Sequence, residues 1–99
     1  MRNQICKLRT KTVSGSEITW HEKEVFCGER SIVASEFYAG YNVGLKLEYS
    51  LDVDPYDFEE AYQDGEAPSE VEYRGKTYIL VRTYKPNETS MELKIGVKL

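Results

Sequence analysis

The stretch Leu45-Lys46-Leu47-Glu48-Tyr49-Ser50-Leu51-Asp52-Val53 decides the fold class of this chain. Every odd-numbered position carries an apolar or aromatic side chain, and every even-numbered position carries a charged residue or serine. Side chains of a β-strand alternate between the two faces of its sheet, so a period of two indicates a strand. We therefore predict a strand over residues 45–53, with its odd-numbered face buried and its even-numbered face in water.

Two further stretches toward the C-terminus also show strand patterns. Residues 71–84 are rich in β-branched and aromatic side chains, and Arg74-Gly75 within them favours a tight hairpin turn because glycine tolerates positive φ. After this turn both faces carry large groups, which predicts a strand in the middle of a sheet. Residues 91–99 alternate again, and the linker Lys85-Pro86-Asn87-Glu88-Thr89 has the composition of a turn. The last strands are therefore expected to form a meander.

Residues 5–13 and 17–26 are weaker strand candidates near the N-terminus. Ser14-Gly15-Ser16 between them has turn composition. In the second stretch Ile18 and Trp20 alternate with polar residues, and a run of charged residues follows. We expect these stretches to form a long hairpin that lies at an edge or protrudes from the sheet.

Two segments lack a strand pattern. Residues 35–44 predict a short helix, with Ser35 as its N-terminal cap and Gly44 at its end. Residues 54–68 are rich in acidic and turn residues and predict a long acidic surface loop, with one helical turn over residues 56–62. Together the elements predict a mainly β fold in a single domain of residues 1–99. We expect a small β-barrel or a rolled antiparallel sheet, with one short helix and the long acidic loop.

The composition fits one small domain without a basic surface. The 99 residues carry a formal net charge of -4, and the sequence pI is about 5.0. Faces that bind nucleic acid usually show clustered Lys and Arg, so no such face is expected. No apolar run approaches the ~20 residues that span a membrane, and residues 1–5 lack the apolar region of a signal peptide. We expect synthesis in the cytoplasm, no membrane partner, and reduced thiols at Cys6 and Cys27, with a disulfide between them as the alternative.

No residue pattern indicates catalysis, a cofactor or a metal site. His21 is the only histidine and is followed by charged residues, so we expect a solvated surface side chain without the partners that general-base work needs. Cys27 lacks the positive surroundings of a reactive thiol, which favours a small buried hydrophobe. The acids from Asp52 onward fail the EF-hand pattern, because Tyr56 takes the fifth position and Gln63 the twelfth. We therefore expect no enzyme activity, no cofactor and no metal ligand, and a function in binding.

Aromatic side chains are the best candidates for an interface. The chain holds eight tyrosines, three phenylalanines and one tryptophan. Many of these are expected in strands, which aromatic residues favour, but tyrosine is also enriched at protein interfaces. The spacing of Phe37, Tyr38 and Tyr41 places them close together on a helix, where they either contact a partner or cover the core. The predicted subunit or partner interface comprises Phe37, Tyr38, Tyr41, Trp20, Tyr56 and Phe58.

Several blocks of the sequence resemble the head-closure proteins of long-tailed phages, which are also called head–tail adaptor, connector or stopper proteins. The blocks occur in the order found in that family: Glu24-Val25-Phe26, Ser31-Ile32-Val33-Ala34-Ser35-Glu36-Phe37-Tyr38, Gly44-Leu45-Lys46, Val71-Glu72-Tyr73-Arg74-Gly75-Lys76-Thr77-Tyr78, Ile79-Leu80-Val81-Arg82-Thr83-Tyr84, and the alternating strand Met91-Glu92-Leu93. The resemblance covers roughly residues 24–95. Residues 1–20 match only loosely, and residues 54–68 look longer and more acidic than is usual in the family.

The resemblance implies a small β-barrel that assembles as a ring beneath the portal of the virion. Such a ring joins the filled head to the tail and helps to retain the packaged DNA. It implies self-association, contacts with a portal-proximal adaptor protein and with a tail-completion or tail-tube protein, and non-specific proximity to DNA at the head–tail junction. Two alternatives stay open: a tail-completion or tail-terminator protein of similar architecture, and a small metal-binding protein that uses residues 54–68.

Overall fold

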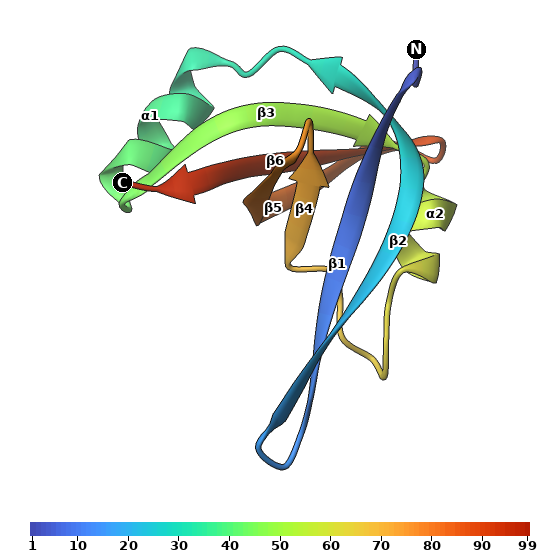
Figure 1. Ribbon diagram of the computed structural model, residues 1–99. Coiled ribbons are helices and arrows are strands. Elements are labelled where there is room, and N and C mark those ends of the chain that lie inside the picture. Colours follow the sequence, from blue (N-terminus) through green and yellow to red (C-terminus); the bar gives the residue numbers. More distant parts are fainter.

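The computed structural model describes residues 1–99 as six strands and two short helices (Figure 1). The elements in chain order are β1 (Gln4–Ser14), β2 (Glu17–Arg30), α1 (Ala34–Asn42), β3 (Leu45–Val53), α2 (Pro55–Glu60), β4 (Glu70–Tyr73), β5 (Lys76–Asn87) and β6 (Ser90–Lys98). All of the predicted strands are present, and β2 extends four residues beyond the predicted end at Phe26, to Arg30.

The six strands form one antiparallel sheet that closes on itself. The strand order is β1-β2-β3-β6-β5-β4, and β4 pairs back onto β1 through residues 6–9. The closure is uneven, because β4 has only four residues whereas β2 has fourteen. The predicted mainly β fold with a rolled antiparallel sheet is therefore confirmed. Closure satisfies edge backbone groups that an open sheet would expose.

The core fills the interior of the closed sheet. Leu51 and Val53 of β3 are buried in this core, as the alternation predicts. Leu47 is also buried but lies on the other face, next to Gly40 of α1, because the register with β6 shifts between Leu47 and Tyr49. The connected core cluster draws on every strand and on α2, and its members are Cys6, Leu8, Val25, Cys27, Leu51, Val53, Phe58, Ala61, Val71, Tyr73, Tyr78, Leu93 and Ile95. Tyr49 packs against this cluster edge-to-face with both Tyr73 and Tyr78, at centroid distances of 5.1 and 5.6 Å.

The even-numbered face of β3 is not in water along its whole length, which corrects the prediction. Ser50 and Asp52 are both buried, although Lys46 and Glu48 remain partly exposed. Charged and polar side chains from other elements cover the end of this face, and their contacts are described below. The alternation therefore identifies the strand and its apolar face, but it does not show that side chains from other elements cover its polar face.

The β4–β5 hairpin has the turn that the sequence predicts. Arg74 and Gly75 join Tyr73 to its partner Lys76, and both turn residues have positive φ, at 53° and 77°. Positive φ at both central positions defines a type I′ turn, whose twist matches that of the flanking strands. In contrast, the predicted loop over residues 85–89 is mostly strand, because β5 continues to Asn87 and β6 starts at Ser90.

Helix α1 lies against β3, and only part of its predicted capping is correct. It ends as expected: Gly44 has φ of +81°, and its amide donates to the Tyr41 carbonyl at 3.1 Å. Its start differs, since Val33 occupies the N-cap without a side-chain hydrogen bond and Ser35 lies inside the first turn. Gly40 is the only fully buried residue of α1, so the helix packs shallowly.

The acidic segment is more ordered than the predicted surface loop. Its first part forms α2, so the chain has two short helices, whereas the sequence predicted one short helix and only a helical turn here. The Asp54 side chain caps α2 by accepting a hydrogen bond from the Tyr56 amide at 2.8 Å. Phe58 and Ala61 then turn into the core. The Ala61 carbonyl accepts from the buried Thr10 hydroxyl at 2.7 Å, which ties the segment to β1.

The β1–β2 hairpin extends beyond the rest of the sheet as a long arm, and residues 14–17 form the end of this arm (Figure 1). The two strands stay paired to the end, from Gln4 opposite Cys27 to Ser14 opposite Glu17. Only the base of the arm joins the closed sheet, where β4 pairs with residues 6–9 and β3 pairs with residues 27–30. The prediction of a protruding hairpin is therefore confirmed.

Substitution of Leu51 tests the predicted core face of β3. Leu51 is fully buried, so Leu51→Ala should lower the free energy of unfolding by about 2–5 kcal/mol, measured by urea denaturation. Leu99→Ala removes the same atoms from an exposed position and should change it by less than about 0.5 kcal/mol. Equal effects of the two substitutions would contradict the described core.

Candidate interaction surfaces

The aromatic side chains of α1 form one cluster on the surface. The Phe37 ring lies 5.7 Å from Tyr38 and 5.0 Å from Tyr41, centroid to centroid. Tyr38 is 66% exposed and Tyr41 is also exposed, whereas Phe37 is half-buried beneath them. The structure thus brings these three predicted interface residues together. Phe37 anchors the cluster, and the two tyrosines face solvent.

A recess lies beside this cluster, between α1 and the outer face of the sheet. Its volume is about 180 Å³, and we call it the α1 groove. Apolar groups of Ala39, Gly40 and Val43 line it from the helix side, and Leu47 and Val81 line it from β3 and β5. Glu36 and Arg82 stand at its charged rim, joined by an ion pair of 3.2 Å.

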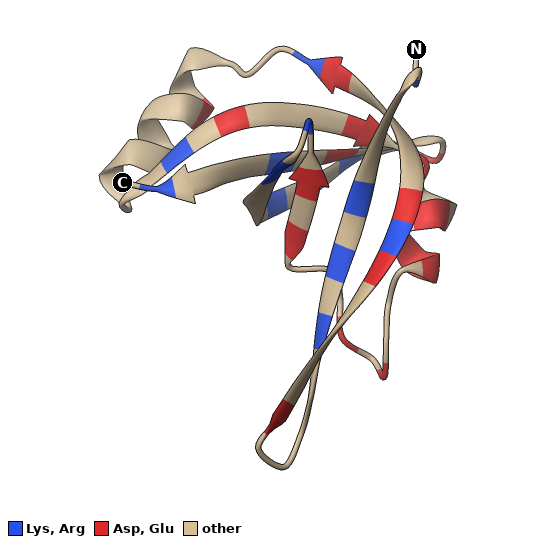
Figure 2. Cartoon of the chain, in the orientation of Figure 1, with Lys and Arg blue, Asp and Glu red and all other residues tan.

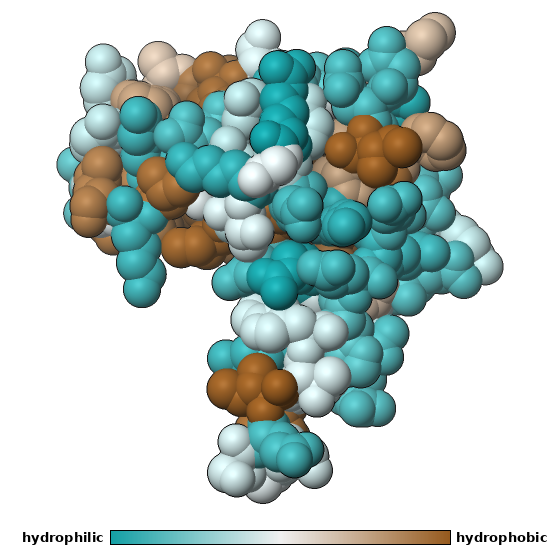
Figure 3. All heavy atoms as spheres, viewed as in Figure 1, coloured by the Kyte–Doolittle hydropathy of each residue, from teal (hydrophilic) through white to brown (hydrophobic).

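A second apolar surface lies at the end of the β1–β2 arm, and we call residues 13–18 the arm tip. Val13 and Ile18 are directly opposite each other in the strand register. They are 61% and 58% exposed, and the space-filling view shows apolar atoms at this end of the molecule (Figure 3). The interface predicted from the sequence includes neither residue. Their signal was present in the sequence, as β-branched residues on both sides of the Ser14-Gly15-Ser16 turn.

Trp20 lies on the arm and is partly covered by another side chain of the same chain. It is half-buried, and the guanidinium carbon of Arg9 lies 4.5 Å from the centroid of its ring. A cation over an aromatic face is attracted by the quadrupole of the ring. Trp20 therefore stiffens the arm through contacts within the chain, and one part of its ring surface is already covered.

The two predicted interface residues of α2 point in opposite directions. Tyr56 is 66% exposed and is available to a partner. Phe58 is only 4% exposed and belongs to the core, so its assignment to the interface is wrong. A helix of six residues leaves too few turns for the sequence pattern to show which side faces inward.

Basic residues form a stripe along β1, and Arg9 at its centre is paired with acids on both neighbouring strands. Figure 2 shows basic residues at every second position in the middle of β1, with glutamates on the flanking β2 and β4. Arg9 contacts Glu22 of β2 at 3.0 Å and also pairs with Glu70 of β4. Lys7 lies in register with Glu24 of β2 and Glu72 of β4. Arg9 therefore joins β1 to both neighbouring strands through paired charges, whereas Lys11 lies opposite Trp20.

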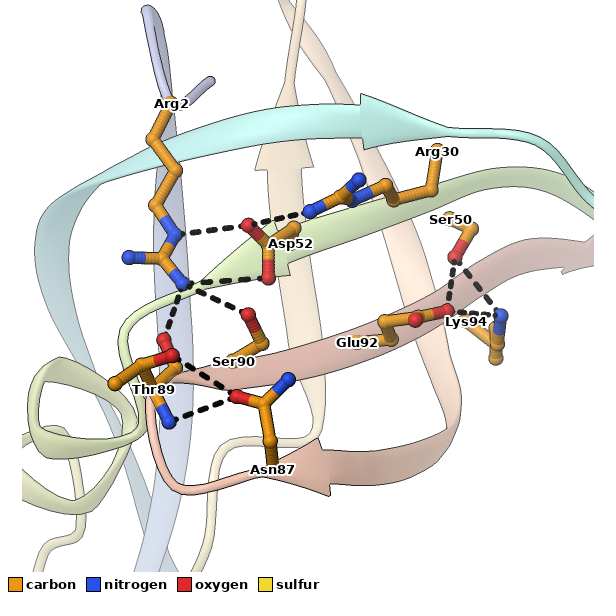
Figure 4. A network of polar contacts seen from close by, with 9 residues as sticks. All are labelled: Arg2, Arg30, Ser50, Asp52, Asn87, Thr89, Ser90, Glu92 and Lys94. Carbon is orange, nitrogen blue, oxygen red and sulfur yellow. Dashed lines mark hydrogen bonds and ion pairs between the residues drawn. The ribbon is translucent and has the colours of Figure 1, made fainter.

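A buried network of charges covers the polar face of β3 and β6 (Figure 4). One part centres on Asp52, whose carboxylate contacts Arg2 Nε at 3.0 Å and an Arg30 guanidinium nitrogen at 3.4 Å. Arg2 also donates to the Thr89 carbonyl and to Ser90 Oγ, so it links the N-terminal residues to the β5–β6 turn. The carboxylate of Asp52 is thereby compensated by two guanidinium groups, which lets it lie out of water.

The other part of the network centres on Lys94 and fixes α1 to the sheet. The side chain of Lys94 is 4% exposed, and its Nζ lies 2.8 Å from Glu92, 2.9 Å from Ser50 Oγ and 3.3 Å from Glu36 of α1. Glu36 in turn contacts Arg82 of β5. An ammonium group at this depth needs such partners, because an unpaired buried charge is strongly unfavourable. Glu36 is therefore the polar anchor of a helix that otherwise packs shallowly.

The histidine and the two cysteines, which the sequence analysis considered as possible catalytic groups, make contacts within the fold. His21 is half-buried on the arm, more than the predicted solvated side chain, and its Nε2 lies 3.0 Å from the Thr12 hydroxyl. Cys6 and Cys27 are free thiols buried in the core, which confirms Cys27 as a small buried hydrophobe. A hydrogen bond to Cys27, together with burial, raises the pKa of Cys6 well above its usual range.

The structure contains no cluster of three or more His, Cys, Asp and Glu side chains that could hold a metal ion. No helix is long and apolar enough to cross a membrane. Comparison of the sequence with protein-family models and with curated proteins gives no match.

The opposite placement of Tyr56 and Phe58 can be measured directly. Phe58→Ala should lower the free energy of unfolding by about 3–5 kcal/mol, because it leaves a cavity in the core. Tyr56→Ala, on the same helix, should change it by less than about 0.5 kcal/mol. A larger loss from Tyr56→Ala than from Phe58→Ala, in the same denaturation experiment, would reverse the described orientation of α2.

The Lys94 network makes a second measurable prediction. Lys94→Met removes the charge that compensates Glu36 and Glu92, and should lower the free energy of unfolding by about 3 kcal/mol. Lys46→Met is the matched control, because Lys46 is 43% exposed and lies 3.7 Å from Glu48. The control should cost less than about 1 kcal/mol. A neutral or stabilising effect of Lys94→Met in thermal or urea unfolding would show that the network does not hold α1 in place.

Proposed function

We propose that this chain is a structural subunit of a phage head–tail connector, of the head-closure or stopper type. In this role it forms a ring between the portal-proximal adaptor and the tail, and the ring closes the DNA-filled head. The observation that carries the proposal is the ordered set of sequence blocks between residues 24 and 95 that resembles this family. A set of weak blocks in a fixed order is more specific than any one of them.

The positions of these blocks in the fold support the proposal. The Glu24-Val25-Phe26 block lies on β2, and the next block runs through the start of α1. Gly44-Leu45-Lys46 joins the end of α1 to β3, and the later blocks form the β4–β5 hairpin and β6. The resembling residues therefore account for most of the closed sheet and for the helix on its surface. The small antiparallel barrel that the resemblance implies agrees with the closed sheet of the structure.

The distribution of exposed apolar groups also suits a ring subunit. In a ring, two different patches meet on neighbouring copies, because each copy presents one patch forward and another backward. This chain has two distinct candidates, the arm tip and the aromatic cluster of α1, which lie on separate parts of the molecule (Figure 1). Exposed groups of this kind are enriched at contacts between proteins.

The charge of the chain is compatible with a passage for DNA. A connector must let DNA slide and must not bind it tightly, so a strongly cationic surface would be a disadvantage. The formal net charge is -4, and Arg9 of the basic stripe on β1 is paired with acids on both sides. We infer that contact with DNA in the ring is non-specific and weak.

Deletion of the gene from the encoding phage or prophage tests the proposed function. Particles made without the chain should include DNA-packaged heads that lose their DNA and lack tails, as seen by electron microscopy. Expression of the chain from a plasmid should restore tailed particles, which controls for effects on neighbouring genes. Normal tailed and DNA-filled particles after deletion would refute the connector function.

A further inference from the structure

We propose that the arm tip of one copy of this chain docks into the α1 groove of a second copy. The inference rests on the proposed function, since it identifies the contact that builds the ring. It assigns the two halves of that contact to residues 13–18 on one copy and to the space between α1, β3 and β5 on the next.

The arm tip has the form of an inserting group. Val13 and Ile18 lie opposite each other at the end of a paired, two-stranded arm, and both are more than half exposed. The rest of residues 13–18 is polar, so the apolar surface is small and confined to the end. A hairpin with its strands already paired loses little conformational freedom when its tip is bound, which favours docking through few side chains.

The α1 groove has the lining and the size to receive such a group. Its walls are mostly apolar, with Ala39, Val43, Leu47 and Val81 contributing side chains. Its volume is about 180 Å³. For comparison, an apolar cavity of about 150 Å³ accommodates a benzene molecule, so one branched aliphatic side chain fits in the space. The Val43 side chain is exposed at the mouth of the groove and would be covered by the tip.

Charges beside the two surfaces are complementary. Glu17 is adjacent to Ile18, is exposed, and makes no ion pair within its own chain. Arg82 stands at the rim of the groove with its side chain 59% exposed, and one of its terminal nitrogens contacts Glu36. A guanidinium group has five N–H donors, so Arg82 retains donors for a second carboxylate. Glu17 lies on the opposite face of the arm from Ile18. A tip that enters the groove end-on would therefore place Ile18 against the apolar lining and carry Glu17 past the rim, on the free side of Arg82.

The placement of the two surfaces favours a ring over a symmetric dimer. The arm tip and α1 occupy separate parts of the molecule, and the hairpin points away from the rest of the sheet (Figure 1). A contact between two different patches leaves one tip and one groove free in every pair of copies. Such head-to-tail contacts continue until a ring closes.

Substitutions that reverse the charge of Glu17 or of Arg82 test this contact in the full-length protein. Sedimentation velocity over a wide range of concentrations should show self-association of the unchanged chain, and Glu17→Arg and Arg82→Glu should each weaken it about tenfold or more. An equal mixture of the two variants should associate again, because each kind of tip then meets a groove of opposite charge on the other variant. Glu88→Arg, at a position 95% exposed on the β5–β6 turn, is the matched control and should associate normally.

Arg82→Glu also removes the ion pair with Glu36 and so could disturb the fold. Two further measurements test the contact without this substitution. Ile18→Ser changes only an exposed side chain, and should weaken association about tenfold without lowering the melting temperature. A photo-reactive residue at position 18 should cross-link to residues 39–43 or 81–82 of a second copy, identified by mass spectrometry. Cross-links to another surface, a mixture that fails to associate, or a chain that is monomeric at all concentrations would overturn the inference.

The phage particles made by the deletion and by the variants distinguish a failure of this inference from a failure of the proposed function. If deletion of the gene abolishes tailed particles but Ile18→Ser leaves them normal, the chain is a connector and the tip does not build its ring. If deletion leaves normal particles while the variants still lose self-association, the contact stands and the connector function is wrong.

Discussion

Closure of the sheet by β4 is the constraint on which the rest of the structure depends. This strand has four residues, yet it pairs with β1 on one side and with β5 on the other. Its Val71 and Tyr73 side chains are buried in the common core, so the same residues close the hydrogen-bonding pattern and fill the interior. The tight turn at Arg74-Gly75 fixes the register between β4 and β5. Without β4, the sheet would have two open edges and the core would lack one wall.

The sequence predicts the strands and the long arm well because these features depend on local alternation and turn residues. Residues 49–53 identify their own apolar face, and Arg74-Gly75 identifies its own turn. The bulge that places Leu47 on the other face leaves no signal in the alternation. The cover over the polar face of β3 could not be predicted in this way. Asp52 is buried because Arg2 and Arg30 reach it, and Ser50 is buried beside Lys94. These partners are distant in sequence and become neighbours only when the sheet closes.

The residues predicted for an interface differ in their exposure, and the differences from expectation have a common physical origin. Tyr38, Tyr41 and Tyr56 are exposed as an interface requires, and Phe37 supports two of them. Phe58 was misassigned because composition alone does not show which side of a short helix faces inward. The exposure of Val13 and Ile18 is not predicted from the sequence, because apolar residues in a strand usually face a core, whereas this part of the arm extends beyond it. Exposure depends on where the closed sheet ends, which is a property of the whole fold.

The position of Trp20 makes the arm visible to spectroscopy. Trp20 is the only tryptophan of the chain, and it lies on the same strand and the same face as Ile18. Its ring is half-buried under the guanidinium group of Arg9. Indole emission shifts with the polarity around the ring and is quenched by nearby charged groups. The indole emission of the unlabelled protein therefore reports on the surroundings of the arm, because the aromatic residues of the core are tyrosine and phenylalanine.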